Sequence, residues 1–507
     1  MTRSAVTNPS LWDATAADTD YPAIAPGQTL EADVVVIGAG ITGLTTALFL
    51  VQRGSRVAVV EADRICAGVT AYTTGKASSL HGLIYRKLTN TFDRATARIY
   101  GEANEAAITR MEGLVAEFDI DCGWTRGPAF TYTRERALLG DIEAEVEAAG
   151  AVGLPASFTT ETELPFEVAG AVRFENQAQF HARRYGLALA RAIQASGGSV
   201  FQNSRIVDVA TSTGRCQVEN GARIDGDHIV LATHIPFLDR GGFFAKCSPS
   251  RSYLMAVEVD ELPPKGMYLG VGAEERTLRS ANGGRFLVLG GESHKTGQEP
   301  DTPARYAAIE AWARKHYTVR RVAYRWSAQD FMSVDGLPYI GRLPLASKRV
   351  WLATGYNKWG LTNGTVAAEI LADGIAGKTN AWAATFDANR KDLGASAKSF
   401  LQTNLDVAKR FVGDRIRHLA TQSAVDVAPD EGAVVKIGGE RAGAYRDAAR
   451  ELHAVSLTCT HLGCHVTWNP AERSWDCPCH GSRFDVEGRI LHGPALEPLE
   501  RVEGQPD

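Results

Sequence analysis

The stretch that decides the fold is Ala32-Asp-Val-Val-Val-Ile-Gly-Ala-Gly-Ile-Thr-Gly43, in which a short apolar run leads into three glycines. The apolar run is typical of a buried strand in a parallel sheet, and the pattern over residues 41–53 predicts a helix after the glycines. Gly38 permits a tight turn, Gly40 lets the backbone approach a pyrophosphate, and Gly43 lets the helix pack closely on the strand. The N-terminus of that helix offers unpaired N–H groups and a positive dipole end to phosphates. The stretch therefore predicts a dinucleotide-binding turn.

A second strand completes the unit. Residues 56–61 are mostly apolar and end at Glu61, which comes 23 residues after Gly38. A carboxylate at the end of this strand can accept hydrogen bonds from a ribose diol. Because strand, glycine turn, helix, strand and acid follow in order, we expect a Rossmann-like dinucleotide-binding domain rather than an incidental glycine turn.

Length and composition exclude several classes of protein. The 507 residues suggest more than one domain, and 44% hydrophobic with 22% charged residues is the composition of a soluble globular protein. The net charge of −5 gives no signal for binding nucleic acid. No run approaches the roughly 18 apolar residues of a transmembrane helix, and the polar N-terminus lacks the apolar core of a secretory signal. We expect a cytoplasmic protein without a transmembrane segment.

The pattern along the chain predicts four segments. Residues 1–30 form a partly extended leader. Helical patterns followed by short strands predict that the nucleotide-binding domain is interleaved with an antiparallel-sheet substrate domain over residues 31–388. Residues 389–423 have a basic, helical pattern and predict a helical connector, whereas residues 424–507, with short strands and many turns, predict a separate all-β domain. The expected fold class is α/β with this all-β domain at the C-terminal side.

Four further segments carry a family resemblance. Residues 65–76 are rich in glycine and hydroxyl groups and can wrap a long cofactor, and residues 229–233 and 355–360 can supply further contacts. Residues 335–341, Asp-Gly-Leu-Pro-Tyr-Ile-Gly, complete the set. On these segments, residues 31–385 resemble the D-amino-acid-oxidase-like FAD oxidoreductases, the group that contains glycine oxidase and sarcosine oxidase.

The resemblance implies FAD as a cofactor. Its pyrophosphate would lie on Gly38, Gly40 and Gly43, its adenosine ribose on Glu61, and its adenine beside Val207. The full set of expected cofactor contacts is Gly38, Gly40, Ile41, Thr42, Gly43, Glu61, Thr70, Thr73, Thr74, Lys76, Val207, Ala232, Thr233, Gly355, Trp359, Gly360, Leu361 and Thr362.

Two departures from the family pattern change the expected chemistry. Sarcosine oxidases tether FAD through a cysteine just before the Asp-Gly-Leu-Pro-like segment, but residues 329–332 here are Gln-Asp-Phe-Met. We therefore expect non-covalent FAD. The family position of the lysine that activates oxygen holds Val288, which disfavours a simple oxidase.

The eight cysteines fall into two groups. Cysteines 66, 122, 216 and 247 are scattered and fit small core residues, whereas the other four lie in Cys459-Thr-His-Leu-Gly-Cys464 and Cys477-Pro-Cys-His-Gly-Ser482. The two loops offer two Cys-plus-His pairs, which is the ligand set of a [2Fe–2S] cluster with two thiolates on one iron and two imidazoles on the other. A structural zinc site prefers cysteine pairs separated by two to four residues, and it would leave two cysteines unexplained. The matched remaining cysteines, 464 and 479, could form a disulfide.

The two loops resemble those of the Rieske family, in its disulfide-bearing branch typical of cytochrome bc complexes, and the resemblance covers residues 424–507. It implies that the ligands are Cys459, His461, Cys477 and His480, that Cys464 and Cys479 form a disulfide, and that Ser482 donates to a bridging sulfur.

The two cofactors together indicate an electron relay. FAD accepts two electrons as a hydride and the cluster passes one at a time, so we expect an amine or amino-acid substrate to reduce FAD and the cluster to pass electrons to an acceptor protein or a quinone. Family oxidases hold a substrate carboxylate with arginine or tyrosine, and Lys358 could face the flavin carbonyl where negative charge develops. The candidate catalytic residues are His81, Lys358, Tyr253 and Arg279, with Arg251 and His294 in similar positions.

Three other functions are alternatives to the relay. A ring-hydroxylating oxygenase needs a mononuclear iron triad, and no uncommitted pair of histidines offers one. An NAD(P)H- or ferredoxin-linked flavin reductase needs a second dinucleotide fingerprint, which the Gly270-Val-Gly272 segment does not supply. A non-catalytic electron carrier would not need the large antiparallel domain, which predicts a substrate pocket. The reductase and the carrier stay open as alternatives.

Overall fold

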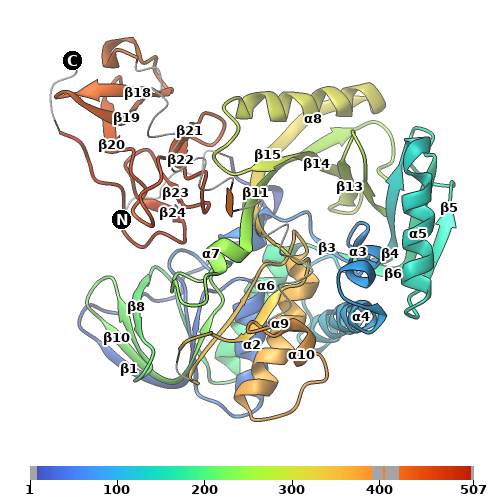
Figure 1. Ribbon diagram of the computed structural model, residues 1–507, viewed down its shortest axis with the longest axis horizontal. Helices are drawn as coiled ribbons and strands as arrows, with labels where there is room; N and C mark the ends of the chain where they lie inside the picture. Colours follow the sequence, from blue (N-terminus) through green and yellow to red (C-terminus); the bar gives the residue numbers. More distant parts are fainter. Residues whose placement is uncertain (1–7, 347, 391–403, 406–421, 504–507) are drawn as a thin grey trace.

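The computed structural model describes residues 8–346, 348–390, 404–405 and 422–503. Residues 8–390 form a large part with two extended sheets, and residues 422–503 form a smaller part with two short sheets (Figure 1). The expected helical connector over residues 389–423 lies almost entirely outside the described residues. Among the described helices, none is both long and apolar enough to cross a membrane.

The first sheet contains the decisive stretch. Its order is β16-β17-β10-β1-β2-β7, with β9 paired to β10 and β8 to β9. β17, β10, β1, β2 and β7 pair in parallel, so the carboxyl ends of β1, β2 and β10 meet at one edge, where the glycine turn follows β1. The strands are β1 (Thr29–Ile37), β2 (Val57–Val60), β7 (Ser199–Phe201), β8 (Ile206–Ala210), β9 (Arg215–Val218), β10 (Arg223–Leu231), β16 (Tyr339–Arg342) and β17 (Val350–Thr354).

The second sheet is antiparallel except for the parallel pair of β4 and β12. Its order is β15-β11-β14-β13-β12-β4-β6-β3, with β5 paired to β6. The helix α8 (Thr302–His316) packs on β11, β14 and β15 and covers one face of these strands (Figure 1). The strands are β3 (Lys76–Ala77), β4 (Thr125–Thr133), β5 (Ala156–Thr159), β6 (Gly170–Gln179), β11 (Cys247–Val259), β12 (Met267–Gly270), β13 (Arg276–Ala281), β14 (Phe286–Lys295) and β15 (Val319–Ser333).

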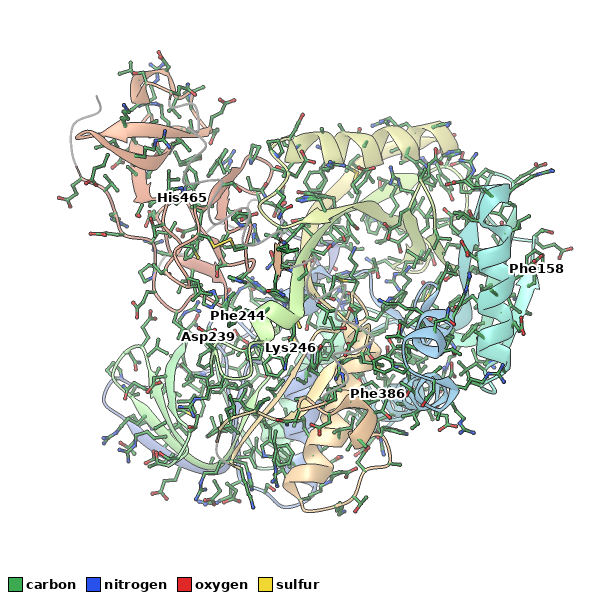
Figure 2. The ribbon with its side chains drawn as sticks, in the orientation of Figure 1. Phe158, Asp239, Phe244, Lys246, Phe386 and His465 are labelled. Carbon is green, nitrogen blue, oxygen red and sulfur yellow. A yellow bond between two sulfur atoms is a disulfide. The ribbon has the colours of Figure 1, made fainter. Side chains whose placement is uncertain are left out.

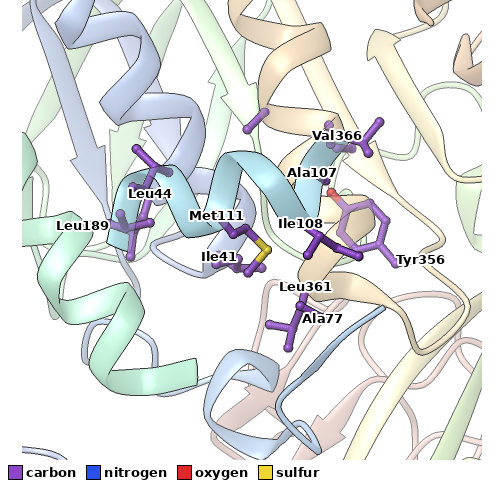
Figure 3. Packing of buried hydrophobic residues seen from close by; sticks show 14 of the residues in the cluster. Ile41, Leu44, Ala77, Ala107, Ile108, Met111, Leu189, Tyr356, Leu361 and Val366 are labelled. Atoms are coloured by element: carbon purple, nitrogen blue, oxygen red, sulfur yellow. The ribbon is translucent and has the colours of Figure 1, made fainter. Parts of the chain in front are cut away.

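Four helices pack into the largest core, beside the first sheet (Figure 3). They are α2 (Ile41–Gln52), α4 (Arg94–Glu117), α6 (Ala182–Ala195) and α9 (Gly360–Ile375). Leu44, Ile108 and Leu189 are fully buried there, and each such side chain contributes about 1.5–3 kcal/mol by leaving water. A Cβ on Gly364 would lie 2.7 Å from Thr42 Oγ1, so α9 approaches α2 more closely than a larger residue would permit. The glycine at position 364 therefore permits the close packing of these two helices.

The remaining elements of the large part are short or lie at its edge. They are α1 (Leu11–Ala14), α3 (Ile84–Thr91), α5 (Leu139–Gly150), α7 (Phe243–Lys246), α10 (Ala383–Phe386) and the 3-10 turns at Val69–Tyr72 and Arg136–Leu138. The N-terminal segment is packed rather than free where it is described. Leu11 and Trp12 are buried, and Trp12 Nε1 donates to the carbonyl of Thr73 at 2.6 Å, next to the segment predicted to wrap a cofactor.

The smaller part has two antiparallel sheets. One is β18-β19-β20 and the other β21-β22-β23-β24, and Trp475 of β22 covers Gly443 of β19, where a Cβ would meet the indole at 2.7 Å. The two sheets therefore pack against each other at this contact, beside two small hydrophobic clusters. The elements are β18 (Gly432–Ile437), β19 (Glu440–Arg446), β20 (Leu452–Ser456), β21 (Thr467–Asn469), β22 (Ser474–Asp476), β23 (Arg483–Phe484), β24 (Ile490–His492) and the 3-10 turn Ala424–Asp426.

Candidate functional site

A cavity of about 670 Å³ extends from the glycine turn to the second sheet and on to the smaller part. This volume is in the upper half of the range of about 300–1,000 Å³ that small-molecule sites occupy. One of its walls is formed by β11, β13 and β14, and another by residues 491–496 of the smaller part, except Pro494. Both parts of the chain therefore line one cavity.

The glycine turn is built by close backbone contacts. Gly38 has φ +104°, and a Cβ on it would lie 2.5 Å from the carbonyl oxygen of Ala232. A Cβ on Gly43 would lie only 1.9 Å from the carbonyl oxygen of Gly38. Larger residues cannot occupy either position, which leaves the N-terminus of α2 open toward the cavity, as binding of a pyrophosphate requires.

Glu61 lies at the other side of this turn. Its carboxylate accepts the backbone N–H groups of Ala39 at 2.7 Å and Asp63 at 3.0 Å, and burial raises its pKa. Thr70 Oγ1 accepts the N–H of Ile41 at 3.0 Å, which joins the loop after β2 to the start of α2. These bonds fix the carboxylate and the loop at the edge of the cavity.

Most of the cofactor contacts predicted from sequence line the cavity. Those in its wall are Gly38, Gly40, Ile41, Thr42, Glu61, Thr70, Thr73, Thr74, Lys76, Ala232, Thr233, Trp359, Gly360 and Leu361. Those outside the wall are Gly43, Val207, Gly355 and Thr362. Gly43 lies beneath Gly38, Thr362 donates to the carbonyl of Ser78 at 3.2 Å, and Arg205 and Ile206 line the wall beside Val207.

His81 lines the cavity with both ring nitrogens engaged. Nε2 contacts the carbonyl of Ser78, which can only accept, so Nδ1 accepts from the Tyr100 hydroxyl at 2.6 Å. Burial lowers the pKa of His81 to about 3, so the ring is neutral. It stacks on Trp359 with centroids 4.4 Å apart. The ring therefore presents a neutral, fixed surface rather than an unpaired basic nitrogen.

Two lysines add positive charge to the cavity. Lys358, at φ +70°, donates from Nζ to Ser293 Oγ at 2.7 Å, and burial lowers its pKa. Lys76 donates to the carbonyl of Tyr268 at 3.1 Å, and burial, followed by the charge of Arg279, lowers its pKa to about 7. Among the described residues neither ammonium group forms an ion pair, so an anionic ligand group would find partners here.

Tyr253 and Arg279 lie outside the cavity wall, unlike the other two candidate catalytic residues. Side chains alternate along β11, so Ser252 and Leu254 face the cavity while Tyr253 faces Tyr306 of α8, with ring centroids 4.9 Å apart. The Tyr253 hydroxyl bonds His294 of β14 at 2.9 Å. Arg279 is turned toward the loop before β3 and donates to the carbonyls of Gly75 at 3.1 Å and Phe180 at 3.3 Å.

Arg251 and His294 do not line the cavity either. Arg251 is buried and lies 3.5 Å from Glu472 of the smaller part, and His294 Nδ1 contacts the carbonyl of Lys295 at 2.8 Å. These two side chains therefore have structural contacts in place of the cavity position expected from sequence.

The two cysteine–histidine loops meet in the smaller part. The rings of His461 and His480 lie 5.1 Å apart, and both Nδ1 atoms are buried with no hydrogen-bond partner among the described residues. Cys459 and Cys477 are each 1% exposed, and their thiols contact each other. Two thiols and two unpartnered imidazole nitrogens are the donor set that a [2Fe–2S] cluster takes.

The loops also supply donors to sulfur. The thiol of Cys477, the backbone N–H of His461 and the hydroxyl of Ser482 lower the pKa of Cys459 to about 6. Ser482 Oγ in turn accepts the N–H of Ala495 at 3.0 Å. Cys464 and Cys479 form the disulfide that the Rieske resemblance implies, with Cα atoms 6.6 Å apart, and it joins the two loops.

The histidine side of this site faces the large part of the chain. His461 Nε2 lies 3.0 Å from Asp239, and Phe244 of α7 packs against both histidines, with ring centroids 5.6 Å from His461 and 5.0 Å from His480. Figure 2 shows Asp239 and Phe244 at the border between the two parts. Sequence reasoning missed both residues, because nothing local marks them as neighbours of a loop more than 200 residues away.

Three polar residues of the cavity wall were also missed. His234 follows β10, Asp330 lies in β15, and His492 ends β24. His234 and Asp330 lie in strand-like segments without a motif. The Gly493-Pro494 pair after His492 is a turn signal that could have marked this loop for inspection.

Comparisons with known proteins agree with this geometry. Residues 33–374 match the family described as FAD dependent oxidoreductase, and residues 418–503 match the Rieske [2Fe-2S] domain. The chain is 37% identical over 491 residues to the putative Rieske 2Fe-2S iron-sulfur protein YhfW of Bacillus subtilis, covering 96% of each chain.

Two further comparisons concern the separate parts. The crystal structure of glycine oxidase from Geobacillus kaustophilus superposes with a TM-score of 0.60 at 18% identity, covering 71% of this chain and 99% of that one. The cytochrome b6-f complex iron-sulfur subunit 2 of Nostoc is 53% identical over 59 residues, covering 12% of this chain and 33% of the subunit. The chain belongs to the FAD dependent oxidoreductase family, with FAD and a [2Fe–2S] cluster as its cofactors, and carries a Rieske domain over residues 418–503.

Proposed function

We propose that the protein is a dehydrogenase of an amine or amino acid, which reduces non-covalently bound FAD and passes the electrons singly through the Rieske cluster to an external acceptor. FAD supplies the two-electron acceptor and the cluster the one-electron carrier. The observation that carries the proposal is the shared cavity. Residues 491–496 of the Rieske domain, except Pro494, line the same cavity as the glycine turn and the second sheet. The flavin site and the cluster domain are therefore neighbours within one chain.

The cavity residues supply binding and orientation. Lys358 and Lys76 offer ammonium groups to a substrate carboxylate or to a flavin carbonyl that gains negative charge. The neutral His81 ring, fixed between Ser78 and Tyr100, positions Trp359 in the wall. A substrate that enters with a neutral amine needs no protein base for hydride loss, so a His81 ring with both nitrogens engaged agrees with the proposal.

Non-covalent FAD is supported by the position of the cavity cysteine. Cys66 lines the cavity, but its thiol lies 3.4 Å from the carbonyl of Ala39, at the end where Glu61 lies. Burial raises its pKa to about 12, which leaves it an unreactive thiol. Met332 occupies the wall near the turn at Gly336. Precipitation of the protein with acid or denaturant tests this point directly. Non-covalent FAD should be released into the supernatant and leave no flavin on the precipitated protein.

An anaerobic reduction panel tests the function. Purified protein is mixed with single amines, amino acids and NADH, while flavin bleaching is followed by absorbance and the reduced cluster by EPR. Bleaching by an amine or amino acid, followed by the cluster signal, is the expected result. Bleaching by NADH alone would contradict the dehydrogenase and support the flavin reductase, and no bleaching by any member would support the electron carrier.

A variant separates the two halves of the reaction. Cys459→Ala removes one thiolate of the cluster, so flavin reduction by the substrate should continue while transfer to a one-electron dye slows. Cys216→Ala is the matched control, since it removes another buried thiol on β9, away from both sites. Unchanged dye reduction in Cys459→Ala would mean that electrons leave the flavin by another route.

A further inference from the structure

Four polar side chains connect the cluster-binding loop with the cavity. Gln329 Nε2 donates to the carbonyl of Gly481 at 2.8 Å, next to the ligand His480, and lies 3.0 Å from His492 Nδ1. His492 Nε2 lies 3.1 Å from His234 Nδ1. His234 Nε2 lies 2.8 Å from Asp330 Oδ1. Of these four residues, His492, His234 and Asp330 line the cavity.

The donor and acceptor roles in this hydrogen-bonded connection follow from the groups at its two ends. The carbonyl of Gly481 can only accept, so it fixes the amide nitrogen of Gln329 on its side, and that nitrogen donates its second proton to His492 Nδ1. His492 then carries its proton on Nε2 and donates it to His234 Nδ1. His234 is left to donate from Nε2 to the carboxylate of Asp330. Each of these four hydrogen bonds thereby has one donor and one acceptor, in one consistent direction.

The surroundings hold the connection in place. Gln329 is 4% exposed, and its oxygen accepts from Thr296 Oγ1 at 3.0 Å. His492 stacks on Phe331, and the N–H of Phe331 donates to Asp330 at 2.7 Å. His234 has φ +68°, a conformation that a non-glycine residue keeps only where its environment over-determines it. Side chains from three distant segments are thus fixed relative to one another.

The contact of Asp239 and Phe244 with the cluster histidines has a different character. Asp239 and Phe244 touch the cluster histidines, but neither lines the cavity. Within the described residues, the connection through Gln329 reaches from the loop of His480 to the cavity wall through side chains, whereas Ser482 of the same loop accepts the backbone N–H of Ala495 in that wall at 3.0 Å.

We propose that Gln329, His492, His234 and Asp330 form the route by which electrons pass from the flavin cavity to the cluster, with Gln329 as the positioning residue that joins the route to the cluster loop. A reduced flavin bound in the cavity would give up its two electrons in two single transfers and release its proton to solvent. Each transfer would reduce one cluster iron from the ferric to the ferrous state, and the external acceptor would take each electron from the cluster in turn. No group is transferred along the route. The inference rests on the proposed function only in assuming that electrons move from flavin to cluster.

The test needs no substrate. In the holoprotein under anaerobic conditions, a laser flash with deazaflavin and EDTA reduces the flavin, and absorbance together with freeze-quench EPR follows its reoxidation by the cluster. Gln329→Leu and His492→Phe should each slow this transfer by roughly tenfold or more, since each breaks the hydrogen-bonded path. Flavin absorbance, the EPR g-values and both midpoint potentials should stay those of the unaltered protein. His453→Phe is the matched control, because His453 lies in the same domain outside the route, beside Asp447.

The double variant adds a readout that a merely structural role would not give. If both residues act in one route, Gln329→Leu/His492→Phe should be no slower than the slower single variant. Transfer rates unchanged in both single variants, or slowing that a shifted midpoint potential explains, would overturn the inference while leaving the relay intact. Failure of the unaltered protein to reduce its cluster from the flavin would instead overturn the proposed relay and this route with it.

Discussion

The two ends of the cavity are built in different ways. The glycine end is made by backbone atoms of one short stretch, where the Gly43 position lies against the carbonyl of Gly38 and Glu61 accepts two backbone N–H groups. The cluster end is made by side chains of distant segments, such as the pair Gln329 and His492, 163 residues apart. Backbone contacts allow no substitution, whereas side-chain contacts can be altered one at a time. The two ends should therefore respond to mutation with very different severity.

The largest effect is expected at the glycine end. Gly43→Val places a branched side chain where even a Cβ would lie 1.9 Å from the carbonyl of Gly38. Overpacking of this kind costs at least about 1–3 kcal/mol, and here backbone must move. We expect protein without bound FAD, measured as the ratio of flavin to protein absorbance after purification. Gly113→Ala, in open space on α4, is the control and should keep its flavin. A Gly43→Val variant with full flavin content would contradict the tight turn.

A large loss of thermal stability, limited to the smaller part of the chain, is expected when the disulfide is removed. Replacing Cys464 and Cys479 by alanine removes a cross-link with a sequence separation of 15 residues. In the chain-entropy account, a disulfide that closes a loop of this length stabilises the folded state by roughly 3 kcal/mol. Thermal loss of the cluster absorbance should shift to a lower temperature, while release of FAD keeps its midpoint. Cys122→Ala, a buried thiol of the large part, serves as control. Equal shifts of both transitions would mean that the two ends are not energetically separate.

A moderate, pH-dependent effect is expected in the middle of the cavity. Burial lowers the pKa of Lys76 to about 7, so its positive charge is present below that pH and is lost as the pH rises through it. The affinity for a carboxylate ligand such as benzoate should fall above pH 7 by roughly tenfold, the scale of one charge-assisted hydrogen bond. Flavin difference spectra between pH 6 and pH 8.5 measure it. Lys76→Met should bind weakly at both pH values, and a persisting pH dependence in that variant would assign the titration to another group.

The smallest effect is expected where the cluster histidines touch the large part. Asp239 accepts from His461 and is about half exposed, so solvent screens its charge. Asp239→Asn should raise the cluster midpoint potential by on the order of 40 mV, which is the one-electron equivalent of about 1 kcal/mol. Redox titration followed by EPR measures it. Asp227→Asn, an exposed carboxylate paired with Arg349, is the control. A fall in potential, or an equal rise in the control, would show that this contact does not bear on the cluster.

Sequence reasoning worked where function depends on neighbours along the chain. The glycine turn, Glu61 and the two Cys–His loops are local patterns with fixed spacing, and their physical reasons can be stated without coordinates. It failed where a face or a partner had to be chosen. Tyr253 lies on β11, but only its packing against Tyr306 of α8 shows that this residue faces away from the cavity. The pair His234 and His492, 258 residues apart, has no local signal at all.

The contact of Asp239 and Phe244 with the cluster histidines also bears on side reactions. His480 and the side chain of His461 are each 5% exposed, so both imidazoles are covered by the chain's own large part. Dioxygen and other small oxidants in solution meet protein surface instead of the iron ligands. In the proposed relay, electrons on the cluster would be shielded from wasteful reoxidation, and an acceptor would take them through intervening protein.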